Sequence, residues 1–143
     1  QTVNTIAPSA WCEIDLRYVT AVQRDEMVGK ITAIVETPEV AGTSAVLSIK
    51  GEFLPLERSS ESAALYETYR EAAAAFGIGV NAEFTGGCAD SGFTAAQGTP
   101  TLCSVGPIGG MAHTPDEFLE VESIVPAAQT LALAVMRAAA RVE

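Results

Sequence analysis

The chain has 143 residues, and 48% of them are hydrophobic, which suits a packed core and argues against disorder. The length suits one domain or parts of two. The 18 acidic and 8 basic residues give a net charge of −10, so nucleic acid and anionic membranes are disfavoured as partners. No apolar run reaches the roughly 20 residues that span a bilayer. We expect a cytoplasmic protein, with the periplasm as the alternative.

The three cysteines, Cys12, Cys88 and Cys103, are an odd number and lack the paired spacing of a structural zinc site. A disulfide framework is therefore not expected. We predict that they are small, mostly buried side chains.

The first third of the chain has the pattern of a strand, a helix and a second strand. Residues 11–19 alternate apolar and polar side chains, apolar residues recur at helical spacing over 24–36, and 45–53 alternates again. A layer of only two strands is marginally stable. We therefore predict an α+β layer in residues 1–54 that needs strands from elsewhere.

The rest of the chain, residues 55–143, alternates predicted strands and helices. Strands are expected over 80–84 and 100–104. We predict three helices: one capped by Ser59 or Ser60, one over 93–96 and one capped by Ser123.

Two features of the sequence are candidate anion sites. Arg17 lies on the polar face of the first predicted strand, where it is either a solvated charge or a clamp for a carboxylate. The turn over 85–90 contains Gly86 and Gly87 and leads into a helix, so its backbone N–H groups favour an anion. A double glycine is also a common feature of plain turns, and that alternative stays open.

The segment over 104–117 holds His113, the only histidine of the chain. Three glycines and a proline precede it, which favours an exposed loop in which backbone approaches a ligand closely. On such a loop the imidazole is either a solvated side chain or a group that reaches a metal or substrate.

Three stretches resemble the C-terminal part of the di-zinc amidohydrolases that include glutamate carboxypeptidase, succinyl-diaminopimelate desuccinylase and acetylornithine deacetylase. Residues 4–18 resemble the segment of the lid, or dimerisation, domain with an Asn-x-(Ile/Val)-Pro motif followed by (Val/Leu)-Asp-(Ile/Val)-Arg-(Phe/Tyr). Residues 85–90 resemble the family's glycine-rich turn that ends in Asp. Residues 106–121 resemble its Gly-Pro-x-Gly-Gly-x-x-His-x-x-(Asp/Asn)-Glu motif, and glutamate carboxypeptidase is the most similar member.

The resemblance implies an α/β fold in two parts. Residues 1–54 would be the C-terminal half of the lid, and residues 55–143 the C-terminal part of the catalytic domain. The chain starts at Gln1 without an initiator Met, which we interpret as an internal cut. The resemblance accordingly implies a missing N-terminal part of the same protein and a homodimer formed through the lid.

The resemblance also implies roles for five residues. His113 would bind one of two zinc ions, for which Co²⁺ or Mn²⁺ can substitute. Arg17 and Asn4 would contact the substrate's carboxylate or the oxyanion, and Gly87 and Cys88 would form the turn that contacts substrate. The general base is expected upstream, so this segment contains no catalytic acid or base. The implied reaction is the cleavage of an amide or peptide bond beside a carboxylate in a small acyl-amino acid or peptide, and we expect the chain alone to be inactive.

Two other classes of function stay open. The chain could be a non-catalytic binding or assembly module that retains the fold, which upstream sequence lacking the His-x-Asp and Glu-Glu motifs would favour. It could also be an independent small α/β domain, which a closed sheet with the His113 loop packed away would favour.

Overall fold

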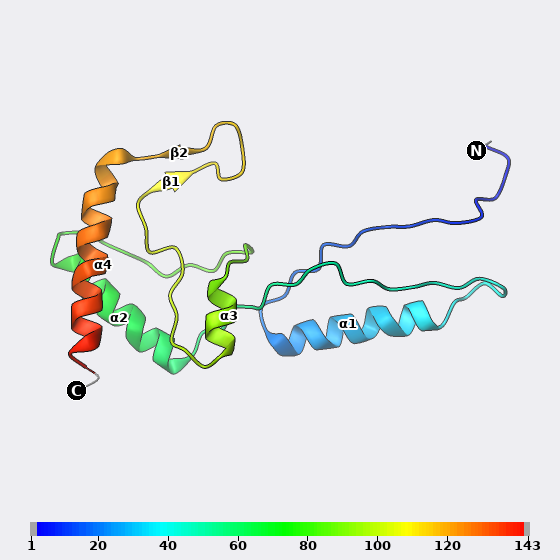
Figure 1. The fold of residues 1–143 in the computed structure, drawn as a ribbon, viewed down its shortest axis with the longest axis horizontal. Coiled ribbons are helices and arrows are strands. Elements are labelled where there is room, and N and C mark those ends of the chain that lie inside the picture. The colour runs from blue at the N-terminus through cyan, green and yellow to red at the C-terminus, as the bar shows by residue number, and fades with distance from the viewer. Residues whose placement is uncertain (1–2, 142–143) are drawn as a thin grey trace.

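The computed structural model describes residues 3–141. Figure 1 shows an extended half, which contains the N-terminal segment and the first helix, and a more compact half, which contains the remaining elements. In chain order the elements are α1 (Ala21–Glu36), α2 (Ser60–Ala74), α3 (Ser91–Ala96), β1 (Gly109–Gly110), β2 (Phe118–Leu119), the 3-10 turn η1 (Val121–Ser123) and α4 (Ile124–Ala139). Within the described residues, every helix is too short or too polar to cross a membrane. The fold thus mixes helices with a short sheet, and the division at residue 54 stays a prediction.

The main packing contact is between α2 and α4, where small side chains let two helices approach closely. Ala72 and Ala73 of α2 are fully buried, and Ala134 of α4 is nearly so. Thr68 and Thr130 are buried in the same two helices. This small-residue contact is the core of the compact half.

Hydroxyl groups on α2 hold the segment that leads to β1. The N–H of Thr101 donates to the Ser62 hydroxyl oxygen at 3.1 Å. The Tyr69 hydroxyl donates to the carbonyl of Val105 at 3.4 Å. Helix α2 therefore positions the chain on its way to the loop that carries the histidine.

The hydroxyl of Ser123 ties the β1–β2 ribbon to the start of α4. Ser123 is the N-cap residue as predicted, but its side chain makes no capping hydrogen bond to α4. Its hydroxyl donates to the Glu120 carbonyl at 2.6 Å and accepts from the Ile108 N–H at 2.8 Å. The capping prediction is therefore wrong, because both bonds of this hydroxyl fix the ribbon instead.

The helices expected near residues 24–36 and 60–76 are present, with shifted starts and ends. The sequence pattern places Asp25 and Glu26 in the first turn of the first helix. Helix α1 begins at Ala21, so these two acids lie beyond its first turn. The Thr20 hydroxyl accepts from the Gln23 N–H at 3.1 Å and caps this helix.

Four strand predictions are wrong, because these segments form no strand in the described structure: 11–19, 45–53, 80–84 and 100–104. The first two run side by side in Figure 1, yet no backbone hydrogen bond joins them. They are tied instead by a side chain, since the Tyr18 hydroxyl donates to the Phe53 carbonyl at 2.7 Å. Alternation within a segment predicts which face is apolar, but a strand also needs a partner backbone.

The predicted burial of the cysteines is also wrong, since Cys12, Cys88 and Cys103 are all exposed. A hydrogen bond with Ser91 lowers the pKa of the Cys103 thiol from its ordinary value, and Ser104 adds to this effect.

Ser59 caps α2 and gives a first test of the fold. Its hydroxyl accepts from the Ser62 N–H at 3.0 Å. We expect Ser59→Ala to lower the free energy of unfolding by about 1 kcal/mol, because that N–H loses its acceptor. Urea unfolding followed by circular dichroism measures the change. Ser44→Ala is the control, since Ser44 is exposed and bonds to no described residue, and an equal loss there would contradict the capping role.

Candidate functional site

His113 lies in the loop between β1 and β2, which pair antiparallel with Gly109 opposite Leu119 and Gly110 opposite Phe118. A Cβ atom on Gly109 would lie 2.8 Å from the Phe118 carbonyl oxygen, and one on Gly110 would lie 2.7 Å from the Phe118 ring. Both distances are too short for a real side chain. Gly109 and Gly110 therefore allow β1 to approach β2 closely.

The loop itself has a strained backbone. Met111, with φ 57°, and His113, with φ 66°, both adopt the left-handed conformation, which costs about 1–2 kcal/mol for a residue other than glycine. The Thr114 hydroxyl donates to the Met111 carbonyl at 2.7 Å, and the His113 N–H donates to Glu117 Oε2 at 3.1 Å. These contacts offset the strain. Strain of this kind clusters at functional sites, and here it falls on the predicted ligand.

The imidazole of His113 is exposed and makes no hydrogen bond or ion pair with any described residue. It is therefore not packed in an interior. Among residues 3–141, however, no three His, Cys, Asp or Glu side chains lie close enough to hold a metal ion. A catalytic zinc ion takes three protein ligands. The described residues thus do not form a complete zinc site.

Arg17 reaches the double-glycine turn from the other half of the chain. Its Nη1 donates to the Gly86 carbonyl at 3.3 Å, across 69 positions of sequence. On its other edge, Asp15 Oδ2 accepts from Nε at 3.0 Å and forms an ion pair with Nη2 at 2.9 Å. The structure therefore brings two of the predicted substrate-binding features into contact, through Gly86 instead of the predicted Gly87.

The turn over 86–90, which contacts this guanidinium through Gly86, has free backbone donors. None of its five N–H groups donates to another described residue. Backbone N–H groups in such a turn attract anions, and a guanidinium binds carboxylates with a matching planar geometry. We call Arg17 and residues 86–90 the Arg17 corner, which also contains the Asp90 carboxylate and has Asp15 paired with its guanidinium.

Not all of the predicted site residues are brought together. Asn4 is exposed and makes no hydrogen bond to Arg17 or to the turn. Cys88 lies in the turn, but its thiol makes no hydrogen bond with a described residue. No hydrogen bond or ion pair joins His113 to the Arg17 corner within the part of the chain that the structure describes.

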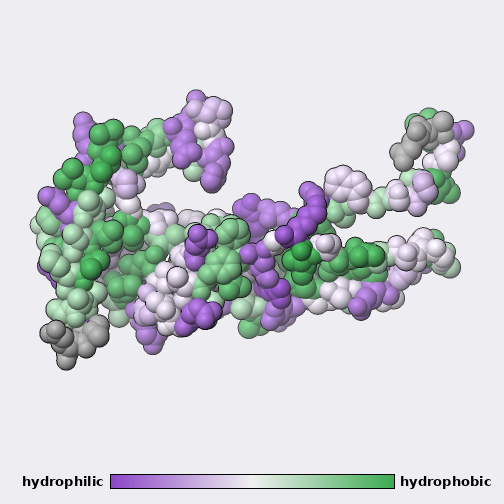
Figure 2. Space-filling view, viewed as in Figure 1, coloured by the Kyte–Doolittle hydropathy of each residue, from purple (hydrophilic) through white to green (hydrophobic). Residues whose placement is uncertain are grey.

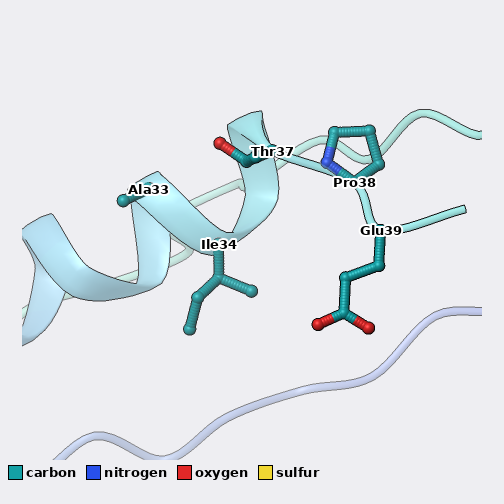
Figure 3. Close-up of a pocket in the computed structure, with 5 residues that line it drawn as sticks. All are labelled: Ala33, Ile34, Thr37, Pro38 and Glu39. Atoms are coloured by element: carbon teal, nitrogen blue, oxygen red, sulfur yellow. The ribbon is translucent and has the colours of Figure 1, made fainter.

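An open depression lies outside these segments in the described part of the chain. Figure 3 shows this depression at the C-terminal end of α1, lined by Ala33, Ile34, Thr37, Pro38 and Glu39. Its only ionisable side chain is Glu39, so it lacks the groups that catalysis or metal binding needs. Figure 2 shows apolar side chains exposed over both halves. Ile49 and Val135 are among the exposed hydrophobic residues.

Sequence reasoning missed two side chains that hold the predicted site residues. Asp15 contacts the Arg17 guanidinium, and the Glu117 carboxylate accepts from the His113 N–H. A signal for Asp15 was present, because residues two apart on an extended segment share a face. Glu117 gave no comparable signal, since its contact depends on the left-handed turn at His113.

A family model described as peptidase family M20/M25/M40 matches residues 13–137 of the chain. No curated protein and no solved structure matches it. The matched range includes His113, Arg17 and the turn over 86–90, and it leaves Asn4 outside. Because the match covers well over half of the sequence, the chain belongs to peptidase family M20/M25/M40.

Proposed function

We propose that this chain is part of a zinc-dependent hydrolase that cleaves an amide or peptide bond beside a carboxylate, in the manner of glutamate carboxypeptidase. The observation that carries the proposal is the contact between Arg17 and the turn over 86–90, which puts a guanidinium, the group suited to binding a carboxylate, against a glycine turn in a member of a peptidase family. The substrate is a small acyl-amino acid or peptide. Residues 1–54 belong to a lid through which the protein dimerises, and residues 55–143 to the catalytic domain of a cytoplasmic enzyme.

His113 supplies one zinc ligand, and the other ligands and the general base come from upstream polypeptide of the same protein. The free imidazole and the absence of a complete ligand cluster among the described residues support this division. When bound, zinc polarises the scissile carbonyl and lowers the pKa of a bound water. The bond from the His113 N–H to Glu117 keeps the loop in the conformation that exposes the imidazole.

The Arg17 corner binds and orients the substrate. The net charge of −10 repels an anion at long range, so a carboxylate substrate needs local positive charge. Arg17 and the free N–H groups of residues 86–90 provide it. Binding energy at this non-reacting end of the substrate holds the scissile bond in position for attack.

A zinc titration tests the metal assignment. We expect isothermal titration of the 143-residue chain to show no submicromolar zinc site, because one imidazole is a weak site by itself. The intact protein, with its upstream polypeptide, is expected to lose amide hydrolysis on treatment with a chelator and to regain it with Zn²⁺. Submicromolar zinc binding by the chain alone would contradict the single-ligand role. Zinc-loaded intact protein that binds an acyl-amino acid without hydrolysing it would favour the binding module instead.

A further inference from the structure

The Arg17 guanidinium has two edges that can hold a carboxylate, and Asp15 already occupies one of them. An arginine side chain carries five N–H donors in a planar fork. Asp15 Oδ2 accepts from Nε at 3.0 Å and lies 2.9 Å from Nη2 as an ion pair, which uses the side edge of the fork. The end edge, between Nη1 and Nη2, is left for other partners.

The end edge faces the turn over 86–90 and has only a weak partner there. Nη1 donates to the Gly86 carbonyl at 3.3 Å, and no other described residue contacts this edge. Charge-assisted hydrogen bonds to a carboxylate are shorter, at about 2.7–2.9 Å. A carboxylate therefore competes well with this neutral carbonyl, and the N–H groups of residues 86–90 have no acceptor among the described residues.

We propose that Asp15 is a positioning residue that aims Arg17 at the turn, so that a substrate carboxylate binds across the Nη1–Nη2 edge. This inference rests on the proposed role of Arg17 in binding substrate. The side chains of Arg17 and Asp15 are 71% and 75% exposed, and an exposed ion pair contributes little to folding stability. The effect of the Asp15–Arg17 ion pair is on orientation, because the pair holds the long, flexible Arg17 side chain in one direction.

Three variants separate this role from a general charge effect. Asp15→Ala removes the acceptor, and Asp15→Asn keeps an acceptor oxygen while it removes the charge. Glu13→Ala is the matched control, because Glu13 is an exposed acid on the same segment that pairs with Lys50 and not with Arg17. Circular dichroism checks that each variant is folded.

The measurement is the affinity of the chain for N-acetylglycine, with its neutral amide N-acetylglycinamide as the reference. Binding is followed by NMR at the Arg17 Nε–H and the backbone amides of residues 86–90. We expect the carboxylate and not the amide to shift these signals. Asp15→Ala should weaken carboxylate binding about tenfold, which is the loss of roughly one oriented hydrogen bond. Asp15→Asn should bind as tightly as the wild type or more tightly, and Glu13→Ala should not differ from it.

The outcomes distinguish this inference from the proposed function. Unchanged binding in Asp15→Ala, together with lost binding in Arg17→Ala, would overturn the positioning role and leave Arg17 as the substrate clamp. Lost binding in Asp15→Asn, as severe as in the alanine variant, would also overturn it. Carboxylate selectivity that survives Arg17→Ala would overturn both the clamp and the positioning role.

Discussion

His113→Ala is expected to remove one zinc equivalent from the intact protein and to lower kcat/KM for amide hydrolysis about a thousandfold or more. The proposed role is a direct metal ligand, and a metal ion stabilises the transition state by several kcal/mol. The chain has no second histidine to replace it. Elemental analysis of the purified protein gives the zinc content, and steady-state kinetics gives the activity.

His113→Asn separates the lost ligand from a disturbed loop. His113 has a φ of 66°, and asparagine tolerates the left-handed conformation better than alanine does. The asparagine variant should therefore keep the thermal stability of the wild type while it loses zinc and activity. Full zinc content and activity in this variant would exclude His113 from the metal site.

Gly92→Ala is expected to destabilise the folded chain by about 3 kcal/mol, at the upper end of the range for overpacking. Gly92 is buried in α3, and a Cβ atom there would lie 1.8 Å from the carbonyl oxygen of Leu54 and 2.7 Å from its carbonyl carbon. Both neighbours are backbone atoms, so no side-chain rotation relieves the clash. Either α3 or the connection at Leu54 must move, and thermal unfolding measures the cost.

Gly29→Ala is the matched control for this prediction. Gly29 also lies within a helix, α1, but a Cβ atom there would have no neighbour within 4 Å. Alanine should stabilise that helix by about 0.5–1 kcal/mol, because glycine loses more conformational freedom on folding. If Gly92→Ala is as stable as Gly29→Ala, the contact between Leu54 and α3 is not part of the folded protein.

Contacts between the two halves could not be predicted from the sequence. Arg17 meets Gly86 across 69 positions, and Gly92 packs against Leu54. No local pattern in the sequence predicts either contact, because both depend on how segments far apart in the sequence are placed in space. The Gly-Gly motif indicated a turn that binds an anion, but the identity of the contacting residue, Gly86, came from the structure.

What the sequence by itself determined is local: all four helices near their observed positions, a cap of the second helix at Ser59 or Ser60, and an exposed histidine loop after glycines. Helix hydrogen bonds and caps join residues three or four apart, so a short stretch of sequence contains all of their partners. The tertiary structure decided the rest: the unpaired segments over 11–19 and 45–53, the exposed cysteines, and the orientation of Arg17 by Asp15. Strand pairing, burial and side-chain direction depend on a neighbour, and the distance to that neighbour is set by the fold.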